Sequence, residues 1–242
     1  ASGLLKGRTR TIALIVSDGP ATAAGVFTQN RVCAAPVHLC RERLPASDAR
    51  GIVICSGNAN ACTGEQGMQD ARRMAALAAA QIGCKPEQVL VCSTGVIGRL
   101  LPMEVFDSGI PKAARSLAHD KPGLIDAAHA ILTTDTRIKV STRCIATDGG
   151  EIRLTGFAKG AAMIGPNMAT MLGFLLTDAA VASNDLQHIL KGSVERSFNC
   201  ISVEGHTSTN DTVLLLANGS GPPLTGPGLV PFANAVHSVC SD

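Results

Sequence analysis

The sequence contains neither tryptophan nor tyrosine, and its only large aromatic residue is phenylalanine, present six times among 242 residues. The chain therefore has too few aromatic side chains to stack on nucleic-acid bases. The 21 basic and 19 acidic side chains leave a net charge of +2 and form no basic block, which argues against a nucleic-acid partner held by phosphate neutralisation. An electrostatic role at a membrane surface is equally unsupported.

Nine cysteines are present, but none of them forms a CxxC pair. This spacing excludes zinc ribbons and thioredoxin-like redox motifs. Several cysteines lie in apolar runs, such as Cys55 in GIVIC and Cys92 in VLVC, where a free thiol behaves as a small hydrophobic residue. The sequence therefore predicts no metal site and a reducing compartment.

No apolar run approaches the roughly 18 residues of a membrane helix, and residues 1–10 lack the apolar stretch of a signal peptide. The patterns GxxxxGK[ST], GxSxG and HExxH and the EF-hand loop are also missing. We therefore expect a cytoplasmic protein that acts on small molecules, binds no cofactor and contacts no membrane.

Short β-type runs alternate with helical patterns, which predicts a mixed α/β fold. The expected strands cover residues 11–17, 52–56, 89–93, 139–145, 151–158, 171–177 and 213–217. The clearest helix spans residues 65–82, with Thr63 and Gln66 as a capping box and Gly83 at its end. Weaker helical patterns span 123–132 and 185–197, and the Gly- and Pro-rich segment 219–228 predicts a surface loop.

The segment 159–170 (KGAAMIGPNMAT) places a lysine, two glycines and a Pro-Asn turn before Thr170, at the head of an apolar strand. A hydroxyl in this position suits an amino-terminal-nucleophile enzyme. In that chemistry the hydroxyl attacks the preceding carbonyl, and the freed α-amine, with a pKa of about 8, becomes its general base. The alternative is that Thr170 is an ordinary β-branched strand residue.

Thr94 and Gly95 follow the apolar run VLVC, where a buried strand is expected to end in a turn. The Thr hydroxyl and the Gly amide can donate two hydrogen bonds to a developing oxyanion, although Thr-Gly turns at strand ends are common. The hydroxyl-rich runs at 133–136 (TTDT) and 207–212 (TSTNDT) either cap a helix or line a polar pocket.

Six blocks of the chain resemble the bacterial ornithine acetyltransferase family, also called the bifunctional glutamate N-acetyltransferases: GVFTQNRVCAAPV, GNANACTG, STGVIG with LPM, TTDT, AKG with GPNMATMLGF, and SFN with ISVEGHTSTNDT. The blocks occur in the family's order and cover nearly the whole chain. This resemblance implies a layered sheet-and-helix sandwich of the self-cleaving amino-terminal-nucleophile type. It also implies cleavage between Ala169 and Thr170, into an α-chain of residues 1–169 and a β-chain of which 170–242 is the beginning.

The resemblance further implies that an acetyl group moves from N-acetylornithine to glutamate through an ester on Thr170, in arginine biosynthesis. Matched by position, Thr94 and Gly95 form the oxyanion hole, while Thr133, Lys159 and Thr170 contact the substrate. A cationic Lys159 suits the substrate α-carboxylate. The family also implies an α/β heterodimer that pairs into a heterotetramer, and acetyl-CoA as a possible co-substrate.

Three features depart from the family pattern. Ala161-Ala162 replace the usual Ser-Gly, and Glu204 and His206 stand where two aspartates normally precede the threonine-rich loop. Family members also continue beyond Asp242 into substrate-binding segments, so we expect this chain to be a truncated piece. Two alternatives stay open: a self-cleaving aminopeptidase-like hydrolase, in which water takes the acyl group, and a non-catalytic truncated homologue.

Overall fold

The structure, a computed structural model, describes residues 10–161, 171–203 and 205–242. Its strands are β1 (Ile12–Phe27), β2 (Ala46–Asn58), β3 (Val89–Val96), β4 (Lys139–Thr147), β5 (Gly150–Lys159), β6 (Leu172–Thr177) and β7 (Thr212–Ala217). Its α-helices are α1 (Ala35–Arg43), α2 (Gly64–Ile82), α3 (Met103–Arg115), α4 (Lys121–Ala130), α5 (Ser183–Glu195) and α6 (Leu229–Ser241). The mixed α/β prediction is confirmed. Within the described residues, no helix combines the length and apolar character needed to cross a membrane.

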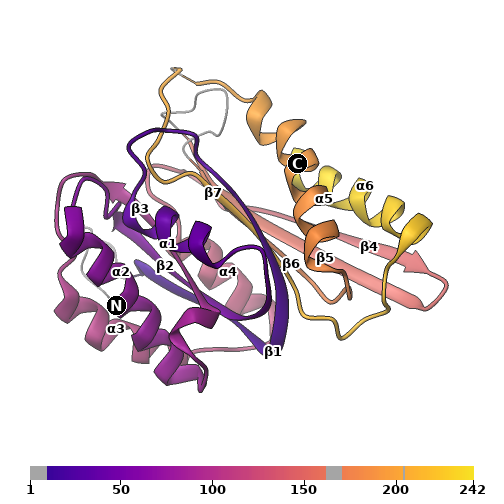
Figure 1. The fold of residues 1–242 in the computed structure, drawn as a ribbon, viewed down its shortest axis with the longest axis horizontal. Helices are drawn as coiled ribbons and strands as arrows, with labels where there is room; N and C mark the ends of the chain where they lie inside the picture. The colour runs from indigo at the N-terminus through magenta and orange to yellow at the C-terminus, as the bar shows by residue number, and fades with distance from the viewer. Residues whose placement is uncertain (1–9, 162–170, 204) are drawn as a thin grey trace.

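The seven strands form one sheet in the order β3-β2-β1-β7-β6-β5-β4. The long strand β1 joins its two halves, because its first half pairs antiparallel with β2 and its second half with β7. The pairs β2–β3 and β6–β7 are parallel. Figure 1 shows β2 and β3 on one side of β1, and β4 to β6 on the other.

The sheet folds back on itself across β1. In a flat sheet, five strand spacings of about 4.8 Å would separate β3 from β5 by about 24 Å. The Nζ atom of Lys159 on β5 nevertheless donates a hydrogen bond of 2.6 Å to Oγ1 of Thr94 on β3. One face of the sheet is therefore turned inward, and the two halves face each other.

Strand alternation sorts the apolar side chains into an inner layer and two outer layers. The inner layer joins both halves of the sheet and includes Ile52, Ile54, Leu90, Cys92, Phe157, Leu172, Phe174, Leu214 and Leu216. Helices α2 and α3 cover the outer face of β2 and β3, whereas α5 and α6 cover the outer face of β5, β6 and β7. The order helix, sheet, sheet, helix confirms the expected layered sandwich.

Helix α2 buries the predicted apolar stripe, and Gly83 ends it in a left-handed conformation. The predicted capping box at its start is wrong. The Thr63 hydroxyl donates to Oδ1 of Asn60 at 2.7 Å and makes no bond to the helix backbone. The side-chain partner in the preceding loop competes with the cap.

All seven predicted strands are present, but the patterns missed α1, α3 and α6. Helix α1 is short and covers the free edge of β3, where Cys40 Sγ accepts from the Val91 amide at 3.3 Å and Arg43 donates to the Val89 carbonyl. The predicted loop at 219–228 is irregular up to its last three residues, which form a 3₁₀ turn (Gly226–Gly228).

Truncation of a side chain in the inner layer tests whether this layer stabilises the folded-back sheet. Phe174 is fully buried, with its ring centroid 5.3 Å from that of Phe157. We expect Phe174→Ala to lower the free energy of unfolding by about 3–5 kcal/mol, measured by urea denaturation. The control Leu117→Ala changes a side chain that is 44% exposed, and we expect an effect within about 0.5 kcal/mol. Equal losses would contradict the shared inner core.

Candidate active site

The carboxyl end of β3 carries the candidate oxyanion hole. Thr94 follows Leu90 and Cys92 on the inward face of the strand and is buried, while Gly95 is exposed. Gly95 has a φ of 134°, and a Cβ atom there would lie 2.2 Å from the carbonyl carbon of Gly57 on β2. Only glycine satisfies both constraints, so the close pairing of β2 and β3 fixes the backbone conformation at Gly95, directly after Thr94; the strand continues to Val96 instead of ending in the predicted turn.

Lys159 is the last residue of β5, and alternation places it on the inward face with Phe157. Its side chain is buried, and its Nζ atom donates to Oγ1 of Thr94 at 2.6 Å. Because the Thr94 oxygen accepts this bond, its own O–H remains available to donate to another group. A buried hydroxyl polarised by a cation is a suitable donor for an oxyanion.

Burial and the neighbouring charged groups determine the pKa of Lys159. Burial lowers the pKa of Lys159 to about 8, and the like charge of Lys139 acts in the same direction. The carboxyl groups of Asp135 and Asp211 oppose this effect. Lys159 is therefore mostly cationic at neutral pH, but it loses its proton far more readily than an exposed lysine.

Asp135 anchors the backbone at Gly160, directly after Lys159. Its Oδ1 atom accepts hydrogen bonds from Lys139 Nζ at 2.5 Å and from the Gly160 amide at 2.8 Å. Burial alone would raise the pKa of Asp135, but these bonds and the charges of both lysines outweigh burial and hold it below the usual value. The sequence pointed to the TTDT run, whereas only the structure identifies its aspartate as the anchoring residue.

The loop before β7 ties the two halves of the sheet together. The Nδ2 atom of Asn210 donates to the Ala59 carbonyl at 2.6 Å and to the Ser93 carbonyl at 2.8 Å, next to Thr94. Its neighbour Asp211 accepts from the Met171 amide at 3.1 Å. The predicted polar run 207–212 thus connects the end of β3 with the start of β6.

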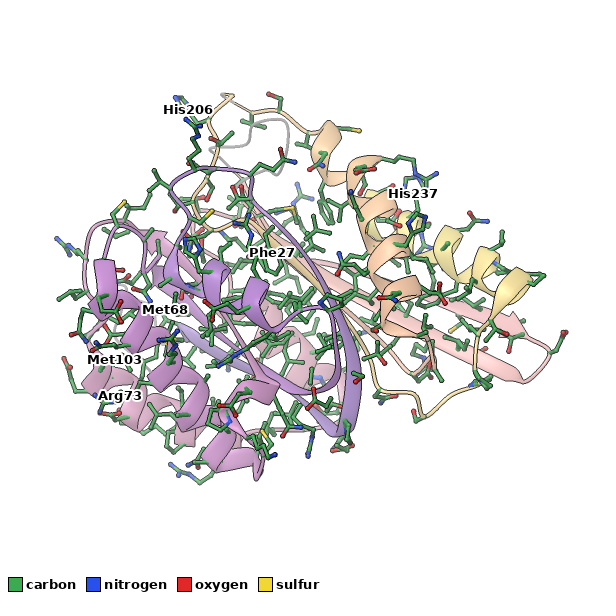
Figure 2. The ribbon with its side chains drawn as sticks, in the orientation of Figure 1. Phe27, Met68, Arg73, Met103, His206 and His237 are labelled. Carbon is green, nitrogen blue, oxygen red and sulfur yellow. The ribbon has the colours of Figure 1, made fainter. Side chains whose placement is uncertain are left out.

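The structure brings Thr94, Gly95 and Lys159 together at one end of the sandwich. Thr133 lies half-buried in the loop between α4 and β4, two residues before Asp135. Ala169 and Thr170 lie outside the described residues. His206 is exposed at the outer part of the loop that precedes β7, as Figure 2 shows.

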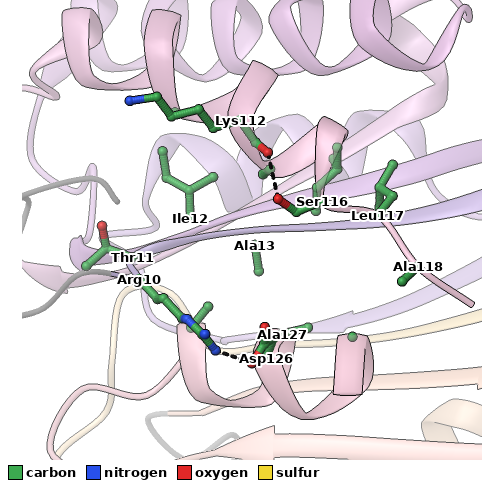
Figure 3. A pocket seen from close by; sticks show the side chains of 15 residues that line it. Arg10, Thr11, Ile12, Ala13, Lys112, Ser116, Leu117, Ala118, Asp126 and Ala127 are labelled. Atoms are coloured by element: carbon green, nitrogen blue, oxygen red, sulfur yellow. Dashed lines mark hydrogen bonds and ion pairs between the residues drawn. The ribbon is translucent and has the colours of Figure 1, made fainter. Parts of the chain in front are cut away.

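A separate cavity of about 390 Å³ lies between α3, α4 and the start of β1. Figure 3 shows the ion pair between Arg10 and Asp126 at its wall. Neither Thr94 nor Lys159 lines this cavity, so it is not the candidate active site. In the part of the chain that the structure describes, no group of three or more His, Cys, Asp or Glu side chains is placed to hold a metal ion.

The two facing halves of the sheet, with helix layers on their outer faces, have the arrangement of the amino-terminal-nucleophile (Ntn) hydrolase fold. The solved l-aminopeptidase d-ala-esterase/amidase from Ochrobactrum anthropi, described as a variant of the Ntn hydrolase fold, matches all of this chain and 79% of its own, with a TM-score of 0.57. Its sequence identity is 12%, so the comparison shows the fold alone.

The chain belongs to the ArgJ family, whose family model matches residues 1–242. The arginine biosynthesis bifunctional protein ArgJ of Caldanaerobacter subterraneus is 53% identical over 222 residues, which cover 90% of this chain and 55% of the relative. The solved ornithine acetyltransferase from Mycobacterium tuberculosis, complexed with ornithine, is 34% identical, with a TM-score of 0.63. That match covers 69% of this chain and 88% of the solved one. The family expected from the six sequence blocks is confirmed.

The close contact between Gly95 and the Gly57 backbone can be tested by substitution of Gly95. We expect Gly95→Ala to lower the free energy of unfolding by about 2–4 kcal/mol, because the new methyl group meets the Gly57 backbone and the positive φ is strained. Gly98→Ala is the matched control, since its φ is also positive, at 79°, but the space around it is open. Backbone strain alone predicts a loss of about 1 kcal/mol there.

Urea denaturation of both glycine variants measures the difference. Equal losses for Gly95→Ala and Gly98→Ala would show that the contact with Gly57 does not constrain the backbone at Gly95.

Proposed function

We propose that this chain forms the acetyl-transfer site of an ornithine acetyltransferase, which moves an acetyl group from N-acetylornithine to glutamate in arginine biosynthesis. The observation that carries the proposal is the buried hydrogen bond from Lys159 to Thr94, beside Gly95. Family membership supports it, as does the ornithine-bound ornithine acetyltransferase among the similar solved structures.

The proposed nucleophile is Thr170, which immediately precedes Met171 at the head of β6. During maturation its hydroxyl oxygen bonds to the carbonyl carbon of Ala169, the peptide C–N bond breaks, and the hydroxyl proton passes to the Thr170 nitrogen. Water then hydrolyses the ester, which leaves a carboxylate on Ala169 and restores the hydroxyl. The products are an α-chain of residues 1–169 and a β-chain that begins at Thr170.

The length of the similar solved chain supports this division. The match to the Mycobacterium tuberculosis ornithine acetyltransferase covers 69% of the 242 residues, or about 167 residues, with 88% of the solved chain used. A separate polypeptide corresponding to residues 1–169 would have this extent.

Acetyl transfer then follows a ping-pong route. The Thr170 α-amine accepts the hydroxyl proton, the hydroxyl oxygen bonds to the acetyl carbon, and the amide C–N bond breaks as ornithine leaves with the proton. The glutamate amine next takes the acetyl group and restores the hydroxyl. Thr94 and Gly95 donate to the oxyanion in both steps, Lys159 pairs with the substrate α-carboxylate, and Thr133 contacts the substrate.

Family membership favours this transferase over an aminopeptidase-like hydrolase, because the hydrolase neighbour shares only the fold. Omission of glutamate distinguishes the two: a transferase stops after one acetyl group per site, whereas a hydrolase continues to release acetate. Acetyl-CoA is the proposed second acetyl donor, and acetylglutamate formation from acetyl-CoA and glutamate tests it. No cofactor is needed for either reaction.

We place the enzyme in the cytoplasm, as an α/β heterodimer that pairs into a heterotetramer. The nine cysteines are free thiols in the structure, which supports a reducing compartment. Native mass spectrometry of the complete protein that contains these residues tests the assembly.

Self-cleavage is tested by the intact mass of that complete protein. We expect two pieces, one ending at Ala169 and one beginning at Thr170. The variant Thr170→Ala lacks the hydroxyl and should remain a single chain. A single species in folded, unsubstituted protein would overturn the proposed mechanism and favour the non-catalytic homologue.

The lowered pKa of Lys159 predicts a pH-dependent KM. Below about pH 8 the ammonium attracts the substrate carboxylate, and above it the neutral amine does not, so KM for N-acetylornithine should rise as pH rises through this value. Lys159→Met should raise KM about 10- to 100-fold at neutral pH and remove the pH step. The control Lys112→Met, at an exposed position of α3, should keep the original profile. An unchanged KM in Lys159→Met would exclude its role in carboxylate binding.

A further inference from the structure

Asp211 is fully buried directly before β7, and the proposed reaction gives it no part. Its Oδ1 atom accepts a hydrogen bond of 3.1 Å from the backbone amide of Met171. Among the described residues, its Oδ2 atom has no hydrogen-bond partner. A fully buried carboxylate with one free oxygen is costly, so its presence at this position requires an explanation.

The surroundings of Asp211 come from four segments. Lys159 faces it from the end of β5, the Thr28 hydroxyl from the end of β1, the Ser208 hydroxyl from its own loop, and the Met171 amide from the start of β6. Burial raises the pKa of Asp211 to about 7, although all four of these groups act in the opposite direction. The carboxyl group therefore changes charge close to neutral pH.

We propose that Asp211 is a positioning residue for self-cleavage: its carboxylate holds the backbone amide of Met171, the residue that follows the proposed nucleophile Thr170 in the chain. The inference rests on the proposed function of Thr170. An asparagine would offer a neutral acceptor of the same shape without burying a charge. An ionised carboxylate differs from it in making a charge-assisted hydrogen bond, which is about twice as strong as a neutral one.

Backbone bonds on both sides of Asp211 keep it in place. The Thr28 amide donates to the Asp211 carbonyl at 2.9 Å, and the Thr212 amide donates to the Met171 carbonyl at 3.2 Å. The side chain of Arg41 donates in turn to the Thr28 carbonyl. Asp211 thus has a rigid backbone from which it fixes Met171, as precise positioning of a reacting group requires.

Because Asp211 changes charge near neutral pH, its proposed role predicts a pH dependence of the self-cleavage rate that a purely structural role would not produce. The ionised carboxylate holds Met171 more firmly than the neutral acid, so the rate of self-cleavage should rise as pH rises through about 7. Asp211→Asn keeps an acceptor but cannot ionise, so its rate should be lower and should show no step at this pH.

The experiment follows cleavage of the complete protein after pulse synthesis in a cell-free system, in buffers on either side of pH 7, by intact mass. We expect Asp211→Asn to slow cleavage about 10-fold and Asp211→Ala about 100-fold. Urea denaturation confirms that each variant folds. If Asp211→Ala fails to fold, Asp211→Asn decides the test alone.

Asp178→Asn is the matched control, because Asp178 also accepts from a backbone amide, that of Arg153 at 2.8 Å, at the opposite end of β6. Its cleavage rate and pH profile should equal those of the unsubstituted protein. Cleavage of Asp211→Asn at the unsubstituted rate, or at a reduced rate with the pH step retained, would overturn the inference. Absence of cleavage in the unsubstituted protein, as in Thr170→Ala, would instead overturn the proposed function.

Discussion

The hydrogen bond between Lys159 and Thr94 is the contact on which the site depends, because it joins strands that lie five places apart in the sheet. It can form only if the sheet folds back across β1. That curvature in turn needs a continuous inner core, which the inward-facing side chains of both halves supply. The same curvature of the sheet thus packs the apolar residues and places the polar side chains of the candidate site.

Burial and the hydrogen bonds around each group then give the two carboxyl groups near the site different pKa values. Asp135 has two hydrogen-bond donors on one oxygen and a pKa below the usual value, whereas Asp211 has weaker support and a pKa raised to about 7. Lys159, enclosed with both, has a pKa lowered to about 8. One end of the sandwich therefore holds a carboxylate that is charged at neutral pH and two groups that change charge near it, a combination that suits the proposed proton transfer.

Short β-type runs were enough to locate all seven strands, and the block resemblance correctly placed the chain in its family. The missed helices have local reasons: α1 is short, and α3 contains Pro111, which weakens its helical pattern. The Thr63 cap failed because a side chain in the preceding loop competes for its hydroxyl. The roles of Asp135 and Asp211 were not predictable, since each depends on a backbone amide distant in sequence.

The sequence by itself determined the class of fold, the family and the residue types available for chemistry, because short β-type runs, helical patterns and short polar blocks are local properties of a chain. Only the tertiary structure decided which face of each strand turns inward. It also decided that Thr94 and Lys159 meet on that face. The same holds for Asp211 and the Met171 amide, 40 residues apart in the chain. Burial and long-range hydrogen bonds set the charge of these groups, and both arise only when the sheet folds back across β1.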